Sequence, residues 1–392
     1  MKSIAAGIDI GTYQTRVVVA ESAEEGDREL PRILGVGYAE SRGLRHGYIL
    51  NQADARKSVT QALSQAAQAA GVPLTRAVAS IGGIGLSSVV ASGAVVTSRA
   101  DSEITELDVK KAVEVSQQQI PVAHTQNRKI IHTIPQSFKV DGRFIPGKPE
   151  GLKGGKLEVK TLFITCFEHH LNDLLEVLSD AGVEVEDIVA SPIAASLVTL
   201  TKQQKMAGVV LANIGSETVS IVVFEGNLPV SLEIFPIGSN DITNDIALGL
   251  RIPLEEAEEV KRDSMVGGMY SRKKLDEIIA ARLSDIFELI EAHLKKIGRN
   301  GLLPAGIVLT GGGSAIETIE DLAKVALKLP SRRAVVSFGD SIKGQIRDAS
   351  WSVAYGLSLI GLQSGEEEHL SGLKLVKKTK NRLLNLFRQF LP

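Results

Sequence analysis

"GIDIGTYQTRVVVA", residues 7–20, has the same shape as "LANIGSETVS", residues 211–220, and its continuation "IVV". Each is an apolar run, a short polar turn and a second apolar run. Superimposing them pairs three positions: Asp9 with Asn213, Gly11 with Gly215, and Thr12 with Ser216. Short apolar runs around a turn predict a strand–turn–strand hairpin. The chain therefore builds one unit twice, as though two related halves began alike.

A hairpin of this kind has the chemistry to bind phosphate. Backbone N–H groups of a glycine turn, together with Ser or Thr hydroxyls, form a concave anion site. Asp9, at the end of the first strand, is placed to hold a water of a Mg²⁺ ion that accompanies the phosphates. Two facing hairpins would clamp a polyphosphate. In "TGGGS", residues 310–314, three positions without a Cβ atom would let the backbone approach a nucleoside.

Composition limits the class of protein. A chain of 392 residues is too long for one compact core, and alternating strands and helices predict an α/β protein of two or more domains. The 44 basic and 46 acidic side chains nearly balance, which argues against nucleic acid as a partner. The single cysteine, Cys166, suits a reducing cytoplasm and is expected to be an inert core thiol. No apolar run approaches the ~18 residues of a membrane-spanning helix.

Together the motifs resemble those of the actin/Hsp70/hexokinase-type ATPases. "GIDIGTYQT" is similar to the first phosphate loop, "LANIGSETVS" to the second, and "GIVLTGGGSAI" (306–316) to the adenosine motif. The resemblance covers residues 4–361 and implies a two-lobed actin-like (RNase H-type) fold that binds ATP and Mg²⁺. It assigns these residues to the nucleotide: Asp9, Gly11, Thr12, Tyr13, Gln14, Asn213, Gly215, Ser216, Glu217, Thr218, Gly311, Gly312, Gly313 and Ser314.

Two further stretches resemble the FtsA family of bacterial division proteins. "IGSNDITNDIALGLRIPLEEAEEVKR" (237–262) carries Glu258 and Lys261, which by analogy face the purine and ribose. Without the resemblance, this pair would be interpreted as a surface ion pair worth about 0.2–0.5 kcal/mol. "IPQSFKVDG" (134–142) and "PEGLKGGKLE" (149–158) resemble elements of the FtsA-specific inserted subdomain. The pilus-assembly scaffold PilM shares much of this plan and stays an alternative.

The resemblance also implies a division of the chain. The expected segments are a first lobe core (1–76, 166–200 and 341–362), an FtsA-type insert (77–165), a second lobe core (201–237 and 303–340), a smaller subdomain of the second lobe (238–302), a linker (363–379) and a terminal helix (380–392). Helices are predicted over 52–70, closed by Gly71, and over 104–119, with Thr105 and Asp108 at the spacing of a capping box. The adjacent His169 and His170 are expected on the surface.

The terminal segment "KNRLLNLFRQFL", residues 380–391, separates into two faces on a helix. Six basic residues lie between 374 and 388, and no acidic residue follows Glu368. A basic amphipathic helix is typical of a peripheral anchor on an anionic membrane, here the inner face of the cytoplasmic membrane. A helix docked on its own domain is the alternative. The expected membrane residues are Arg382, Leu383, Leu384, Leu386, Phe387, Arg388, Phe390 and Leu391.

The second loop departs from the family pattern D-I-G-G-G-T-T-D. Asn213 replaces the first acid and supplies no negative charge to a metal or to an attacking water. Glu217 places a carboxylate near the expected phosphates, which repels them unless it points away or meets the metal. Ser220 replaces the second acid. We therefore expect ATP to bind as a structural and assembly ligand, with slow or absent hydrolysis.

The FtsA resemblance implies a set of partners. These are the C-terminal peptide of FtsZ, bound by the subdomain 238–302, further copies of the chain, other division proteins at the division site, and the membrane. Five basic residues on a predicted helix would receive an acidic peptide or form an ordinary solvated face: Lys273, Lys274, Arg282, Lys295 and Lys296. A PilM-like scaffold would instead bind an N-terminal peptide of a pilus membrane protein. A sugar-kinase-type phosphotransferase is disfavoured, since no acidic base is placed for that reaction.

Overall fold

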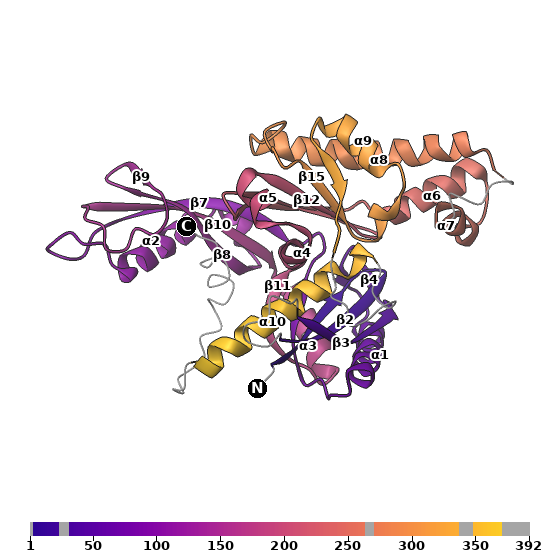
Figure 1. Cartoon of the computed structure of the whole chain (residues 1–392), viewed down its shortest axis with the longest axis horizontal. Coiled ribbons are helices and arrows are strands. Elements are labelled where there is room, and N and C mark those ends of the chain that lie inside the picture. Colours follow the sequence, from indigo (N-terminus) through magenta and orange to yellow (C-terminus); the bar gives the residue numbers. More distant parts are fainter. Residues whose placement is uncertain (1–2, 23–30, 263–269, 337–347, 371–392) are drawn as a thin grey trace.

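The computed structural model describes residues 3–22, 31–262, 270–336 and 348–370. Within these ranges the chain forms two five-stranded sheets, one four-stranded sheet and a short two-stranded hairpin. Figure 1 shows the two lobes one above the other, with the insert extending to one side. The predicted membrane helix, 380–392, lies outside the described residues, so its role stays a prediction.

The first lobe is built on a sheet of strand order β11-β6-β1-β2-β3. β1 is antiparallel to β2 and parallel to β6, and β6 is parallel to β11. The strands are β1 (Ile4–Ile10), β2 (Gln14–Glu21), β3 (Arg32–Glu40), β6 (Arg76–Ile81) and β11 (Glu184–Ala190). The small hairpin of β4 (Leu44–Arg45) and β5 (Tyr48–Ile49) follows β3.

The second lobe repeats this topology with order β14-β13-β12-β15-β16. If the strands of each sheet are numbered one to five along the chain, both sheets have the order 3-2-1-4-5, the first sheet being read from its β3 edge. Corresponding neighbours are parallel or antiparallel in the same way. The strands are β12 (Val209–Ile214), β13 (Val219–Glu225), β14 (Leu228–Phe235), β15 (Ile307–Thr310) and β16 (Ser331–Arg333). The predicted duplication is confirmed, and the fold is actin-like.

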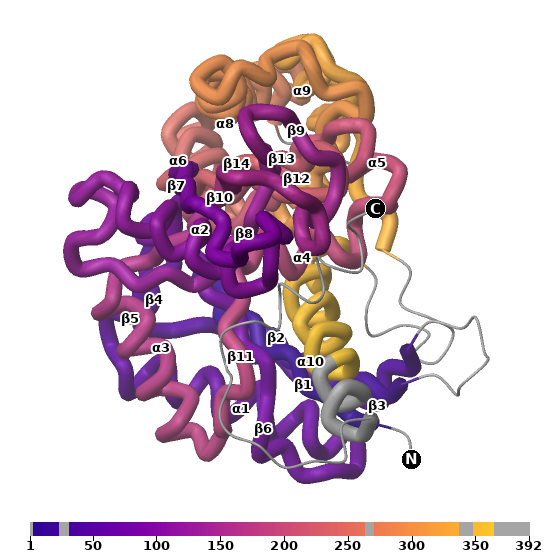
Figure 2. The backbone as a smooth tube through the Cα atoms, turned by 90° about the vertical axis from the view of Figure 1, so that its left-hand side faces the viewer, coloured from indigo at the N-terminus to yellow at the C-terminus, as the bar shows by residue number. Residues whose placement is uncertain are grey.

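Helices cover both sheets. In the first lobe these are α1 (Gln52–Ala70), α3 (Glu168–Asp180), α4 (Ser191–Thr199) and α10 (Ser352–Leu370). α1 ends at the left-handed Gly71, as predicted, and the Asn51 side chain caps its start. α10 packs on β1 so closely that a Cβ atom on Gly7 would lie 2.2 Å from the Ala354 carbonyl oxygen (Figure 2). That contact fixes the strand that leads into the first loop.

The second lobe carries α5 (Lys202–Ala207), α6 (Ser239–Leu250), α7 (Leu254–Arg262), α8 (Arg272–Lys296) and α9 (Ile319–Leu327). Three 3-10 turns complete the described elements: Val122–His124, Gly312–Ala315 and Ala349–Trp351. α10 runs to Leu370, so the first residues of the expected linker, 363–379, are helical. Gln and Glu are good helix formers, so the polar composition of this stretch does not by itself end the helix.

The insert is an antiparallel sheet of order β7-β10-β8-β9 with one helix. Its elements are β7 (Ser87–Val96), α2 (Glu106–Gln118), β8 (Arg128–Val140), β9 (Arg143–Ile145) and β10 (Lys156–Phe167). The Thr105–Asp108 capping box is present, as predicted. The expected start at residue 77 is wrong, because β6 lies between β1 and β11 in the first sheet. Its apolar run cannot be told from the insert's strands by pattern alone.

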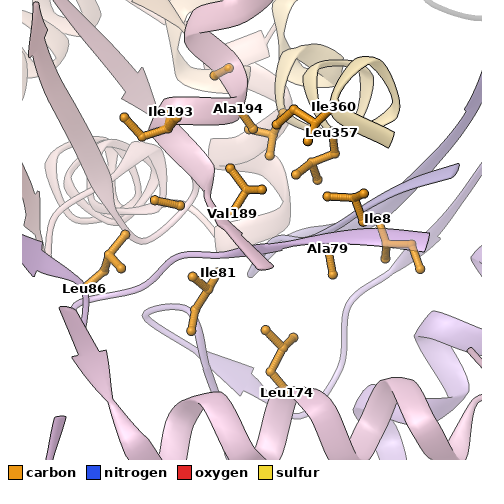
Figure 3. Close-up of a cluster of buried hydrophobic side chains, with 14 of the residues drawn as sticks. Ile8, Ala79, Ile81, Leu86, Leu174, Val189, Ile193, Ala194, Leu357 and Ile360 are labelled. Atoms are coloured by element: carbon orange, nitrogen blue, oxygen red, sulfur yellow. The ribbon is translucent and has the colours of Figure 1, made fainter. Parts of the chain in front are cut away.

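The core of the first lobe lies between its sheet and the helices (Figure 3). Ile8, Val189 and Leu357 are fully buried there, each worth about 1.5–3 kcal/mol on burial. Cys166 is buried as expected, and burial raises the pKa of its thiol to about 12, which keeps it inert. The expectation of two surface histidines is wrong for His170: its ring is buried, with Nε2 3.0 Å from the Gly82 carbonyl oxygen.

Candidate functional site

A cavity of about 1200 Å³ lies between the two lobes. All predicted nucleotide residues line it except Ser314. Ser314 is buried behind the glycine loop, where its Oγ donates to the Gly311 carbonyl oxygen at 2.7 Å. The structure therefore brings together residues that lie up to about 300 positions apart in the sequence. Nucleotide binding by these residues stays a prediction.

The two polar turns have equivalent geometry. The Gly11 N–H donates to the Gln14 carbonyl oxygen at 3.2 Å, and the Gly215 N–H donates to the Thr218 carbonyl oxygen at 2.9 Å. Both hairpins have matching registers, since Asp9 pairs with Arg16 and Asn213 pairs with Ser220. The second turn is also tied to the start of α6, because Asn240 N–H donates to the Ser216 carbonyl oxygen at 2.8 Å.

Asp9 lies on the buried wall of the cavity, beside Arg16. Ser80 Oγ donates to Asp9 Oδ1 at 2.8 Å. Burial raises the pKa of the Asp9 carboxyl, and the Ser80 bond and the Arg16 charge oppose that shift. The Arg16 guanidinium lies over Trp351, 5.6 Å from the ring centroid, and its Nε has no hydrogen-bond partner in the part of the chain that the structure describes. One carboxylate and one guanidinium thus face the space between the loops.

This donor set fits Mg²⁺ only in company with phosphate. Among the described residues, no three His, Cys, Asp or Glu side chains gather closely enough to hold a metal ion. Mg²⁺ commonly binds through one or two carboxylates, several waters and substrate phosphates. The Asp9 carboxylate and the Thr12 hydroxyl on the same cavity wall suit that arrangement, and Asp9 is the metal residue that the sequence predicts.

The glycine loop needs its glycines for two different reasons. Gly311 has φ +83°, and a Cβ atom there would lie 2.2 Å from Asn213 Oδ1. Within the described residues, no atom other than those of its two chain neighbours lies within 4 Å of the Cβ position on Gly312. Gly311 is thus required by the protein itself, whereas Gly312 leaves open space at the cavity wall.

Glu258 and Lys261 belong to a network rather than to a solvated surface pair. Lys261 Nζ lies 2.6 Å from Glu258 Oε2, and the lysine side chain is only 8% exposed. Lys261 also donates to Thr243 Oγ1 at 2.7 Å and to the Ser239 carbonyl oxygen at 3.0 Å. Thr243 in turn donates to Glu258 at 2.6 Å. The network joins α6 to α7 on the cavity wall.

Sequence reasoning missed several residues of the cavity. Arg16 was detectable, because the predicted hairpin places it opposite Asp9. Arg262 ends the quoted stretch 237–262 but was not singled out, and further cavity residues come from other segments: Arg45, His46, Ser80, Gly82, Gly83, Ser191, Arg272 and Asp348. Glu217, whose direction the sequence left open, bonds to His46 of the first lobe at 2.6 Å.

Three of the five α8 residues expected to receive an acidic peptide have partners within the described residues. Arg282 bonds to Asp245 at 2.7 Å and to Asp285 at 3.1 Å. Lys274 donates to the Gly249 carbonyl oxygen at 2.6 Å, and Lys295 pairs with Glu291 at 2.9 Å. An acidic peptide would therefore compete with existing bonds at these positions.

Comparison with known proteins assigns the chain to a family. The family model described as "Cell division protein FtsA" matches residues 210–356, and that described as "SHS2 domain inserted in FTSA" matches residues 83–165. Cell division protein FtsA of Pseudomonas aeruginosa is 30% identical over 378 residues, 91% of this chain and 89% of that protein. Its Bacillus subtilis counterpart is 32% identical over 371 residues, 89% and 81% of the two chains. This chain belongs to the FtsA family.

Solved structures confirm the actin-like fold of this FtsA-family chain. A chain of the PilM–PilN type IV pilus biogenesis complex has a TM-score of 0.66 at 19% identity, covering 91% of this chain and 98% of that one. MreB5 of Spiroplasma citri bound to ADP has a TM-score of 0.53 at 14% identity, covering 94% and 99%. At these identities the likeness shows the fold alone. The helices described here all lack the length or the apolar character needed to cross a membrane.

Proposed function

We propose that this FtsA-family protein binds ATP with Mg²⁺ in the cavity between its lobes. The observation that carries the proposal is the pair of equivalent glycine turns, one from each lobe, lining the same cavity. Backbone N–H groups and hydroxyls of these turns would hold the phosphates. Gly311 to Gly313 and the Glu258–Lys261 network would hold the adenosine, and Asp9 would hold Mg²⁺ through water.

The bound ATP would act as a structural and assembly ligand. A fast ATPase needs a group that positions and deprotonates the attacking water. Asn213 and Ser220 carry no negative charge in the second hairpin, and the Asp9 carboxylate is engaged by Ser80. Steady-state phosphate release would therefore be slow or absent. In this proposal ATP holds the lobes together and promotes self-assembly, to be tested by sedimentation with and without ATP.

We further propose that the protein tethers FtsZ filaments to the inner face of the cytoplasmic membrane at the division site. Family membership supports a role in division, and the basic amphipathic sequence 380–391 supports the anchor. The test is sedimentation with anionic vesicles, comparing the full chain with Phe387→Glu and with a chain ending at Leu370, where α10 ends. Both variants should stay in solution. Equal sedimentation of all three would exclude the anchor.

The partner is tested by binding the full-length protein to two peptides. One is the C-terminal peptide of FtsZ, and the other is a short N-terminal peptide of a pilus membrane protein, as a PilM-like scaffold would require. The proposal expects binding of the first alone, weakened by Lys273→Glu on α8. Binding of only the pilus peptide would favour the PilM-like function. Phosphate transfer to a small hydroxyl substrate would instead favour the sugar-kinase alternative.

A further inference from the structure

The second phosphate loop reaches across the cavity to the first lobe. Glu217 Oε2 accepts a hydrogen bond from the His46 backbone N–H at 2.6 Å. The His46 ring nitrogen Nδ1 also lies 3.1 Å from the Glu217 backbone oxygen. His46 belongs to the turn between β4 and β5, 171 positions away in the sequence. One residue of the second lobe is therefore held at two points by one residue of the first.

The turn that receives Glu217 offers it one backbone N–H. His46 and Gly47 both have positive φ angles, +47° and +81°. The Gly47 N–H donates to Thr12 Oγ1 of the first phosphate loop at 3.1 Å, while the His46 N–H donates to the Glu217 carboxylate. A carboxylate of the protein itself thus accepts a backbone N–H next to the first loop, where a phosphate oxygen is the other kind of anionic acceptor.

The turn cannot easily rearrange to offer a different donor. A Cβ atom on Gly47 would lie 2.4 Å from the Gly83 Cα atom, so the two glycines pack backbone against backbone. The Ile84 N–H donates to the His46 carbonyl oxygen at 3.2 Å, which holds the turn from its other side. The His46 N–H is therefore a donor at a fixed position, and an anion can use it only by binding at that position.

A polyphosphate held by both loops must enter the gap that Glu217 spans. Phosphate and carboxylate are both anionic acceptors, so they compete for one N–H and repel each other. The Asp9 charge is paired with Arg16 and would be offset further by Mg²⁺, which leaves Glu217 as the carboxylate in direct competition with a phosphate. A triphosphate brings more negative charge into this gap than a diphosphate, so it meets the greater repulsion.

We propose that Glu217 is a specificity residue that disfavours the terminal phosphate of ATP, because its carboxylate occupies the His46 N–H that this phosphate would otherwise use. The inference rests on the proposed function, in which the cavity binds a nucleotide. The nucleoside diphosphate leaves the Glu217–His46 bond intact, whereas the triphosphate must displace it. Binding of ATP would then break the Glu217–His46 bond between the lobes, whereas binding of the diphosphate would not.

The test is calorimetric titration of the full chain with ATP–Mg²⁺ and with ADP–Mg²⁺. The measured quantity is the ratio of ATP affinity to ADP affinity. Glu217→Gly should raise the ratio at least tenfold, and Glu217→Gln should raise it in the same direction, since Gln keeps an acceptor but loses the charge. Glu317→Gln is the matched control. Glu317 is an exposed cavity residue bonded to Arg272 at 3.4 Å, and its replacement should change the ratio less than twofold.

Two results would overturn the inference while leaving nucleotide binding in place. The first is a ratio within twofold of the unaltered protein for both Glu217 variants. The second is an equal rise in the Glu317 control, which would indicate a general effect of charge. If neither nucleotide binds the unaltered protein or any variant, the proposed function fails and the inference fails with it. Thermal unfolding of each variant confirms that it is folded.

Discussion

Arg262 Nη2 lies 2.9 Å from the Tyr13 hydroxyl oxygen, so that α7 of the second lobe is bonded to the first phosphate loop. The guanidinium also lies over the phenol ring, 5.7 Å from its centroid. This bond and the Glu217–His46 bond cross the cavity at different places. Both bonds join the lobes across the cavity in which we propose that the nucleotide binds.

Removing the hydrogen bond between Arg262 and Tyr13 should speed nucleotide exchange. Tyr13→Phe deletes the acceptor for Arg262 but keeps the ring. A hydrogen bond to a charged group is worth about 1.5–3 kcal/mol, and less at this exposed position. We expect association and dissociation of a fluorescent ATP analogue, followed by stopped flow, to be faster by about 3–10-fold. Tyr38→Phe, an exposed tyrosine outside the cavity, should change neither rate. Unchanged rates in Tyr13→Phe would contradict the claim that this bond slows nucleotide exchange.

Alanine at two neighbouring glycines should separate folding from binding. Gly311→Ala forces a Cβ atom against Asn213 at a positive φ, and should lower the free energy of unfolding by more than about 1 kcal/mol. Gly312→Ala meets no atom of the described residues beyond its chain neighbours, so stability should be unchanged while nucleotide affinity falls. Denaturation and nucleotide titration of both variants measure this. Full affinity in Gly312→Ala would place the nucleoside elsewhere.

The rate of ATP hydrolysis should depend on whether position 213 in the second hairpin carries an acid. The unaltered chain should release phosphate at well under the ~1 s⁻¹ of slow working enzymes. Asn213→Asp restores an acid at this position, and general-base catalysis typically contributes about 10²–10⁴-fold. Asn240→Asp, on the same cavity, is the control. Rapid hydrolysis by the unaltered chain would contradict the assignment of ATP as a structural ligand.

The junction of the insert with the first lobe should be sensitive to acid. His132 on β8 is buried, and its Nε2 accepts the Ala190 N–H at 3.0 Å. Burial lowers the pKa of His132 to about 3. Below about pH 6.5 the unfolded chain therefore binds a proton that the folded chain does not, and stability falls as the pH falls toward 3.

Proton binding to one such histidine in the unfolded chain lowers the free energy of unfolding by about 2 kcal/mol as the pH falls from 6.5 to 5. Burial also lowers the pKa of His293, to about 4, so the total loss is larger. His132→Gln should reduce the pH dependence of the free energy of unfolding by about the share of one histidine. Denaturant titrations at pH 5, 6 and 7 provide the measurement. An identical slope in the variant would mean that His132 is protonated in the folded state.

The sequence predicted the parts of this molecule that local patterns determine. Both hairpins, the α1 stop at Gly71 and the α2 capping box follow from spacing and residue type. The boundary at β6 did not, because a buried strand reads alike whichever sheet it joins. The burial of His170 also depends on contacts distant in sequence.

The residues of the cavity also divide into those that local patterns predict and those that they do not. Its motif residues were predicted, and Arg16 follows from the hairpin register. The partners of Glu217 and Tyr13 come from segments 171 and 249 positions away, and no periodicity brings His46 or Arg262 to them. Contacts between lobes therefore needed the structure.

The most direct test of this account is a crystal structure of the protein with ATP and Mg²⁺. We predict electron density for the nucleotide between the two glycine turns, with its phosphates between Thr12 and Ser216, its adenosine against Gly312, and the metal beside Asp9. A cavity without nucleotide at saturating ATP, or a nucleotide bound outside it, would contradict the central claim.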